Sequence, residues 1–288
     1  MVCPAGYMAK ERTEACAEVL LQWGFKLSYG KTIGSQVHYF SGTDDERLAD
    51  LQDMIDNPEI NAVLCARGGY GTSRIMDRIN WSAFRKKPKW IIGYSDITAI
   101  HCHLERKLNT ASLHAPMAGA FADAQGIDEF NSTLEKALKG RKLRYHSPAY
   151  GLNRTGKAEG KLIGGNLSLL AHLVGTTSMP STDGAILFVE EIGEYLYHVD
   201  RMLLQLDRAG KLANLGGIIF GGFTEMKDTV TPFGETLEAI LYAHVKKYNF
   251  PVAFQFPVGH ARENVALRVG MPHTLSVTTK GATLISSP

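Results

Sequence analysis

Apolar and polar positions alternate in blocks along the first half of the chain. Residues 61–66 and 90–92 are short apolar runs that end in glycine-containing turns, a pattern typical of buried strands. Around them, apolar residues recur at helical intervals in residues 9–23, 44–55 and 96–108. Because strands that alternate with helices favour a parallel sheet, we expect such a sheet with helices on its faces.

Capping signals and weaker patterns give the remaining elements. Thr43 and Glu46 have the spacing of a capping box, and Asn166 is a suitable N-cap for a helix over residues 167–174. The weaker patterns predict strands at residues 26–29, 110–114, 185–189, 217–220, 267–269 and 275–277, and helices at residues 72–79, 129–138, 197–206 and 236–246.

Residues 140–160 interrupt this alternation with a polar stretch that is punctuated by glycine and proline. We therefore predict one domain over residues 1–140, a linker over residues 141–160 and a second domain over residues 161–288. The length agrees with this division, since 288 residues at about 150 per domain correspond to roughly two domains.

The composition excludes several classes of protein. With 44% hydrophobic and 21% charged residues, the chain lacks the bias of disordered, collagen-like or coiled-coil sequences. The net charge of +2, carried by scattered basic residues, gives no reason to expect nucleic acid or an anionic membrane as a partner. No apolar run approaches the ~18 residues that a membrane-spanning helix needs.

The cysteines and the first residues bear on the cellular compartment. Cys3, Cys16, Cys65 and Cys102 are far apart and include no Cys-x-x-Cys pair, so we expect no disulfide framework. Residues 1–6 lack the basic and apolar regions of a signal peptide. These observations predict a cytoplasmic protein.

The sharpest local motif is Gly93-Tyr94-Ser95-Asp96, between an apolar strand and a helix. At such a turn the Ser95 hydroxyl is exposed, and the backbone N–H after it lies at a helix N-terminus, which favours negative charge. The motif differs from the Gly-x-Ser-x-Gly of common hydrolases, so it is weak alone. Ser95 is therefore either a nucleophile or only the N-cap of the helix.

A second motif, Arg67-Gly68-Gly69-Tyr70-Gly71, follows the strand of residues 61–66. Its glycines let backbone amides turn outward and surround an anion. The motif is neither a P-loop nor a dinucleotide fingerprint. It is either a simple tight turn or, if the two strands are neighbours, a source of an amide beside Ser95.

The third candidate region combines an acidic strand end with a distant histidine. Glu190 and Glu191 close the apolar run of residues 185–189, and His260 follows an apolar loop and a glycine. A serine nucleophile needs an imidazole that titrates near neutral pH and a carboxylate that orients it. His101 and His103 do not share a helix face, so we expect no metal site there.

Together these segments resemble the serine LD-carboxypeptidase family, which includes the muramoyl-tetrapeptide carboxypeptidases. The resemblance extends from Pro4 to about Val277, nearly the whole chain. It rests on residues 66–71, 93–96, 164–169, 189–194, 200–203 and 259–260.

The resemblance implies an α/β fold of two domains with the active site at their interface. A Rossmann-like N-terminal parallel sheet carries the nucleophile, and a smaller C-terminal α/β domain carries the other two members of a triad. By position, Ser95 is the nucleophile, Glu190 the orienting carboxylate and His260 the general base. The backbone amides of Asp96 and Gly69 form the oxyanion hole, and the reaction needs no metal or organic cofactor. Glu191 then has only a surface or loop-capping role.

The implied activity is a cytoplasmic carboxypeptidase that releases the terminal D-Ala from murein tetrapeptides during peptidoglycan recycling, and the implied assembly is a homodimer. The substrate carboxylate needs a partner such as Arg67 or Arg201, although Arg67 is equally suited to a structural ion pair. Two alternatives are an immunity peptidase that cleaves a microcin C-type peptide–nucleotide, and a module that binds an anion or nucleotide without chemistry.

One departure from the family pattern concerns the front of the chain. Relatives have a full apolar strand before the Pro-Ala-Gly turn, whereas only Met1, Val2 and Cys3 precede Pro4 here. Either the first strand is very short or the natural chain begins further upstream.

Overall fold

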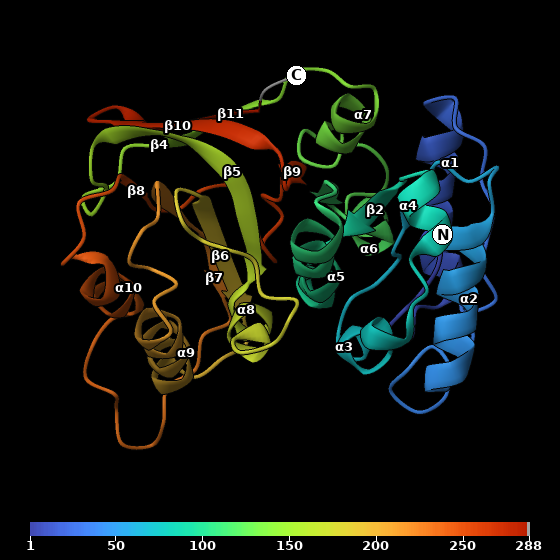
Figure 1. The fold of residues 1–288 in the computed structure, drawn as a ribbon, viewed down its shortest axis with the longest axis horizontal. Helices are drawn as coiled ribbons and strands as arrows, with labels where there is room; N and C mark the ends of the chain where they lie inside the picture. Colours follow the sequence, from blue (N-terminus) through green and yellow to red (C-terminus); the bar gives the residue numbers. More distant parts are fainter. Residues whose placement is uncertain (287–288) are drawn as a thin grey trace.

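A computed structural model describes residues 1–286, which form two β-sheets with helices packed against them (Figure 1). The N-terminal half lies on the right of the view and the C-terminal sheet on the left. Helix α5 (Thr98–His103) lies between them and packs against the long strand β5 (Gly156–Asn166) and helix α8 (Leu167–Leu173). The α/β fold with two sheets agrees with the prediction.

The first sheet has the strand order β1 (Ala62–Leu64), β2 (Trp90–Gly93), β3 (Ser112–His114), β9 (Leu267–Val269). Its first three strands are parallel, as predicted, and β9 joins as an antiparallel edge strand. Alternate residues of β2 enter different cores, because successive strand residues point to opposite faces. Ile92 packs with the helices on one face, and Ile91 packs with those on the other.

Helices and turns cover both faces of this sheet. The capping box at the start of α2 is present: Glu46 N donates to Thr43 Oγ1 at 3.2 Å, and Thr43 N donates to Glu46 Oε2 at 2.8 Å. The helical segments of this half, besides α5, are η1 (Lys10–Thr13), α1 (Glu14–Gln22), α2 (Asp44–Asp56), α3 (Thr72–Ile75), η2 (Met76–Arg78), α4 (Ser82–Lys86), η3 (Ser95–Ile97), η4 (Leu104–Leu108), α6 (Ala118–Asp123) and α7 (Thr133–Leu138).

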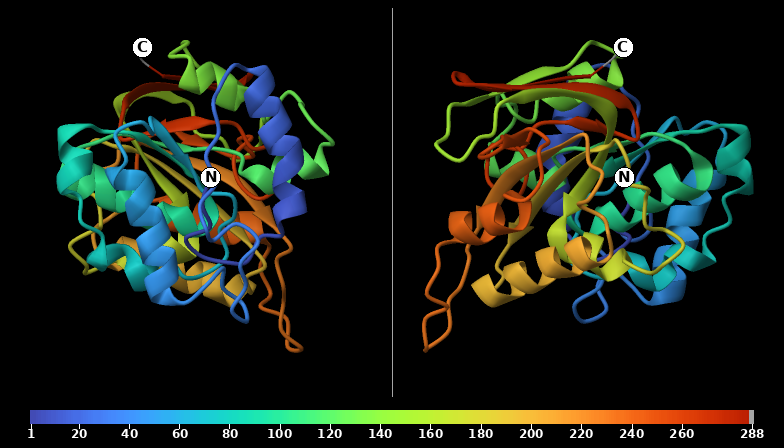
Figure 2. Two further views of the ribbon diagram at one scale, coloured as in Figure 1. Left: turned by 90° about the vertical axis from the view of Figure 1, so that its right-hand side faces the viewer. Right: turned by 60° about the vertical axis from the view of Figure 1, so that its left-hand side comes forward.

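The second sheet has seven strands in the order β4-β11-β10-β5-β6-β7-β8. Strands β5 to β8 are parallel, and the part from β4 to β5 is antiparallel. The loop between β7 and α10 extends away from the body of the molecule (Figure 2). Besides β5 and α8, the elements are β4 (Arg144–Pro148), β6 (Ile186–Ile192), α9 (Leu196–Arg208), β7 (Gly217–Thr224), α10 (Leu237–Val245), β8 (Val252–Ala253), β10 (Pro272–Thr278) and β11 (Gly281–Ser286).

The C-terminal half is larger and more connected than the sequence indicated. Residues 141–160, expected to be a linker, contain β4 and the start of β5, and the supposedly smaller domain has the larger sheet. Strand β4 is an edge strand with mostly exposed or half-buried residues. It therefore lacks the apolar run that marks a buried strand.

The beginning of the chain contributes little regular structure. Residues 1–3 form no strand beyond a single parallel bridge between Val2 and Cys65. The strand expected at residues 26–29 is absent: this segment has no regular secondary structure, and the Met1 amino group donates to Ser28 O at 2.6 Å. All four cysteines are buried and free, and no helix within residues 1–286 is both long and apolar enough to cross a membrane.

Candidate active site

A single residue, Tyr94, separates Ser95 from the end of β2, and Ser95 is the first residue of η3. Its φ is 63°, in the left-handed region that residues other than glycine rarely adopt. The Ser95 hydroxyl lies 3.0 Å from His260 Nε2, and no side chain caps the start of η3. The alternative role of Ser95 as a helix N-cap is therefore excluded. Backbone strain of this kind is concentrated at functional sites.

The imidazole of His260 connects the two sheets. Its Nδ1 lies 2.5 Å from Glu190 Oε2, and its Nε2 faces the Ser95 hydroxyl. Glu190 is in β6 and fully buried, and the His260 side chain, in the loop after β8, is 12% exposed. Residues that are far apart in the sequence thus form one hydrogen-bonded row of hydroxyl, imidazole and carboxylate. Such a row is suited to removing a proton from the hydroxyl.

A glycine before the histidine permits this contact. Gly259 has a φ of 135°, and a Cβ there would lie 3.1 Å from Glu190 Cβ. A larger residue would therefore separate His260 from its carboxylate. Asn264 Oδ1 accepts a hydrogen bond from Gly259 N at 3.2 Å and lies 3.2 Å from His114 Nε2. Asn264 belongs to no recognised motif, so the sequence did not identify it.

The surroundings of His260 change its basicity. Burial is the largest single influence and by itself lowers the pKa of His260. The hydrogen bond to Glu190 and its charge raise the pKa, and the charges of Glu191 and Glu225 add to this effect. These contributions outweigh burial, so the pKa of His260 lies above its usual value of 6.5.

The glycine-rich turn lies against the serine, because β1 and β2 are neighbours. A Cβ on Gly68 would be 3.0 Å from Ser95 Cβ and 3.3 Å from Asp96 N, so this approach requires glycine. Within residues 1–286, the amides of Gly69 and Asp96 donate no hydrogen bond in the protein. Both amides are therefore free to donate to a ligand oxygen.

The Asp96 side chain links the serine turn to the glycine-rich turn. It is buried, and its Oδ2 accepts a hydrogen bond from Thr72 N at 2.8 Å, at the start of α3. Burial raises the pKa of Asp96, against the hydrogen bond from Thr72 and the charge of Arg47. The carboxyl group thus holds the two loops that supply the free amides in a fixed relation.

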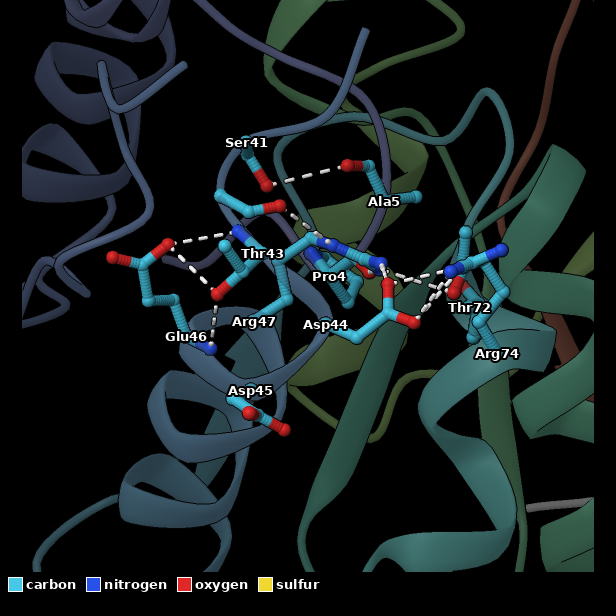
Figure 3. A network of polar contacts seen from close by, with 12 residues as sticks. Pro4, Ala5, Ser41, Thr43, Asp44, Asp45, Glu46, Arg47, Thr72 and Arg74 are labelled. Atoms are coloured by element: carbon cyan, nitrogen blue, oxygen red, sulfur yellow. Dashed lines mark hydrogen bonds and ion pairs between the residues drawn. The ribbon is translucent and has the colours of Figure 1, made fainter. Parts of the chain in front are cut away.

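Arg47 supports the same glycine-rich turn through Gly71 O, and its guanidinium lies beside Pro4 and Asp44 (Figure 3). Its guanidinium is fully buried, and it donates to Pro4 O, to Gly71 O at 3.0 Å and to the Asp44 carboxylate. Helical spacing placed Arg47 in α2 but gave no sign of burial. Its burial depends on carbonyl groups from distant loops, which compensate for the loss of water.

Glu191 is buried, and it is neither a surface charge nor part of the row. Its two oxygens accept four hydrogen bonds: from Asn166 Nδ2 at 2.8 Å, Ile192 N at 2.9 Å, Ser168 N at 2.7 Å and Ser168 Oγ at 2.6 Å. It therefore caps the N-terminus of α8 together with Asn166, whose Oδ1 accepts from Leu169 N as predicted.

A cavity of about 870 Å³ opens beside the row. Tyr94 and His260 line it, and the two rings pack edge to face with centroids 5.0 Å apart. Arg67 also lines this cavity, whereas the other predicted carboxylate partner, Arg201, does not and lies over the Tyr197 ring. The volume is typical of a site for a small organic or peptide ligand.

The remaining histidines of the motif region are structural. Burial lowers the pKa of His101 to about 4, and its ring nitrogens contact Ser112 Oγ and Gly93 O. His103 contacts Ser178 Oγ and stacks on Trp81. No group of side chains in the described part of the chain has the arrangement of a metal site.

Comparisons with known proteins agree with this architecture. The LD-carboxypeptidase N-terminal domain model matches residues 1–115, and the C-terminal domain model matches residues 159–275. A probable murein peptide carboxypeptidase of Bacillus subtilis is 33% identical over 99% of this chain and 90% of its own length. The microcin C7 self-immunity protein of Escherichia coli is 26% identical over 98% of this chain and 90% of its own length.

Among solved structures, the muramoyltetrapeptide carboxypeptidase of Oxalobacter formigenes is similar, with a TM-score of 0.89 and 29% identity. The match covers 100% of this chain and 98% of that one. The predicted fold and the prediction of a serine-type carboxypeptidase are thereby confirmed. The chain belongs to the LD-carboxypeptidase family.

Proposed function

We propose that this carboxypeptidase hydrolyses the amide bond between an L-centre and the terminal D-Ala of murein tetrapeptides, and leaves a tripeptide. The names of its relatives, a probable murein peptide carboxypeptidase and a muramoyltetrapeptide carboxypeptidase, support this substrate. The observation that carries the mechanism is the continuous row from Ser95 Oγ through His260 to Glu190, with distances of 3.0 Å and 2.5 Å.

In the acylation step, the Ser95 oxygen attacks the carbonyl carbon while His260 Nε2 takes the hydroxyl proton. The carbonyl oxygen becomes an oxyanion, and the amides of Asp96 and Gly69 donate to it. Each donor contributes roughly 3–4 kcal/mol to transition-state stabilisation. Glu190 accepts a hydrogen bond from His260 Nδ1 and stabilises the imidazolium that forms.

D-Ala then leaves, and water hydrolyses the acyl-enzyme. The C–N bond breaks, His260 returns its proton to the amine of D-Ala, and the tripeptide remains esterified to Ser95. Water attacks this ester while His260 takes one of its protons, and the proton passes back to the Ser95 oxygen as the tripeptide leaves. The net reaction consumes one water molecule for each amide bond cleaved.

The cellular setting is part of the proposal. Four free, buried cysteines are consistent with a reducing compartment, so we place the enzyme in the cytoplasm, acting on recycled cell-wall fragments. We also propose a homodimer, as the resemblance to the family implies. Sedimentation of the purified protein at several concentrations tests the assembly, and a monomer at all of them would contradict it.

Mass spectrometry of the products from a defined L,D-tetrapeptide tests the activity. Ser95→Ala and His260→Ala should fold normally and lower the rate of D-Ala release by at least about 10⁴-fold. Ser82→Ala, at an exposed serine of α4, is the matched control and should retain full activity. Near-normal turnover by Ser95→Ala would refute the mechanism. Cleavage of a peptide–nucleotide conjugate in preference to the tetrapeptide would favour the immunity activity instead.

A further inference from the structure

Three arginines line the active-site cavity, and their charges are balanced differently. Arg12 pairs with Asp123 at 2.7 Å, and Arg262 pairs with Asp128 at 3.3 Å. Both acids also line the cavity. Arg67, the third arginine, has no carboxylate within 4.0 Å among residues 1–286. The cavity therefore has one positive charge that the described protein does not neutralise.

The Arg67 guanidinium is oriented by the protein, and most of its N–H donors remain free in the described part of the chain. Its Nη1 donates to Tyr7 O at 2.8 Å, and its Nε lies near the backbone of Gly6, where an added Cβ would be 3.5 Å away. An arginine has five N–H donors in a planar fork. A single backbone carbonyl orients this fork and leaves most donors for a ligand, so the structural ion pair considered from the sequence does not form.

The position of Arg67 in the chain relates it to the reacting atoms. It immediately precedes Gly68, which lies against Ser95, and its side chain lines the same cavity as His260. The leaving amino acid must lie within reach of His260, because the imidazole returns a proton to its amine. Its carboxylate is separated from that amine by a single carbon atom. A carboxylate at this end of the substrate therefore enters the cavity that Arg67 lines.

We propose that Arg67 binds the terminal carboxylate of the substrate and so restricts the enzyme to removal of the last residue. The proposal rests on the proposed function, since it assigns one end of the same substrate. A planar guanidinium can hold a carboxylate through two parallel N–H···O bonds, which a neutral terminal amide cannot reproduce. Arg67 thus distinguishes a carboxypeptidase from an endopeptidase.

The test compares a tetrapeptide that ends in D-Ala with the same peptide that ends in D-Ala amide. The wild-type enzyme should prefer the free acid in kcat/KM by roughly 100-fold, the range expected for charge-assisted hydrogen bonds. Arg67→Met should lose this preference by slowing cleavage of the acid about 100-fold and leaving cleavage of the amide nearly unchanged. Calorimetric binding of both peptides to Ser95→Ala, with and without Arg67→Met, should show the same selective loss.

Two further variants serve as controls. Arg67→Lys keeps the positive charge but lacks the planar guanidinium, so it should retain an intermediate preference for the acid over the amide. This variant keeps the proposal testable if Arg67→Met folds poorly. Arg201→Gln removes the other arginine considered from the sequence, which does not line the cavity, and it should leave the acid-to-amide ratio unchanged. Equal rates on acid and amide in the wild type, or an equal loss on both in Arg67→Met, would overturn the role of Arg67. Absence of any L,D cleavage in the wild type would instead reject the proposed function.

Discussion

Two adjacent carboxylates in β6, Glu190 and Glu191, share a strand and a residue type but differ in their surroundings. Both are almost completely buried. Glu191 accepts four hydrogen bonds, and three of them come from the start of α8. Within residues 1–286, the Glu190 side chain forms a hydrogen bond with His260 alone, through Oε2, and its Oε1 is buried without a hydrogen-bond partner.

The difference separates a structural carboxylate from one available for chemistry. A buried acceptor without donors normally destabilises a protein, so it persists where another requirement maintains it. The positive charge that forms on His260 during the proposed reaction would be such a requirement, because it appears 2.5 Å from Glu190. Burial alone therefore does not identify the functional carboxylate. The number of donors around it does.

The largest expected effect is on turnover in Glu190→Gln. The carboxamide can hold the imidazole in the wrong tautomer and cannot stabilise its charge, so kcat should fall about 10³–10⁴-fold. The free energy of unfolding should change little, because this side chain forms a single hydrogen bond in the described part of the chain. Rate measurements on the tetrapeptide and chemical denaturation would test both parts. A variant that retained activity would remove the proposed distinction between the two acids.

Glu191→Gln should have the opposite profile. Its carboxamide has one acceptor oxygen where four donated hydrogen bonds now converge, and its NH₂ group faces donors at the start of α8. We expect a loss of about 1–3 kcal/mol in the free energy of unfolding and a change in kcat of less than about tenfold. Urea denaturation and the same rate assay provide the measurements. Full stability combined with a large loss of activity would contradict the capping role.

The smallest expected effect is on the pH profile. The pKa of His260 lies above 6.5, and the base must be neutral, so kcat/KM should rise with pH through a value above 6.5. Removing a nearby negative charge lowers this pKa and moves the acid limb to lower pH. NMR titration of the ring should show a larger shift for Glu190→Gln than for Glu191→Gln, because Glu190, unlike Glu191, forms a hydrogen bond with His260. Equal shifts of the His260 pKa in the two variants would mean that the hydrogen bond from His260 to Glu190 adds nothing to the effect of the negative charge.

The sequence predicted the parts of the fold that depend on local patterns. The runs at residues 61–66 and 90–92 contain the strands β1 and β2, because apolar residues there face cores on both sides of a sheet. The motif with Ser95 and the strand end with Glu190 were visible as well, and the resemblance to a family indicated their proposed roles. Strand β4 was missed because an edge strand needs few apolar residues.

The environment of each side chain could not be read from these patterns. Glu191 was expected to carry a surface or loop-capping charge, yet it is buried. Its burial arises because α8 follows the neighbouring strand β5 and begins beside Glu191. Arg47 was not recognised, since its burial depends on carbonyl groups of Pro4 and Gly71 that only the fold assembles. Long-range contacts of this kind leave no mark in residue spacing.

Strand β9 has a consequence for any attempt to divide this protein. It comes from the C-terminal half of the chain yet forms the edge of the first sheet, next to β3. A fragment that ended near residue 140 would leave the backbone of β3 unpaired on that side, and exposed strand edges promote aggregation. The N-terminal half is therefore completed only when the last third of the polypeptide has been synthesised, and the same part of the chain carries His260, the partner of Ser95.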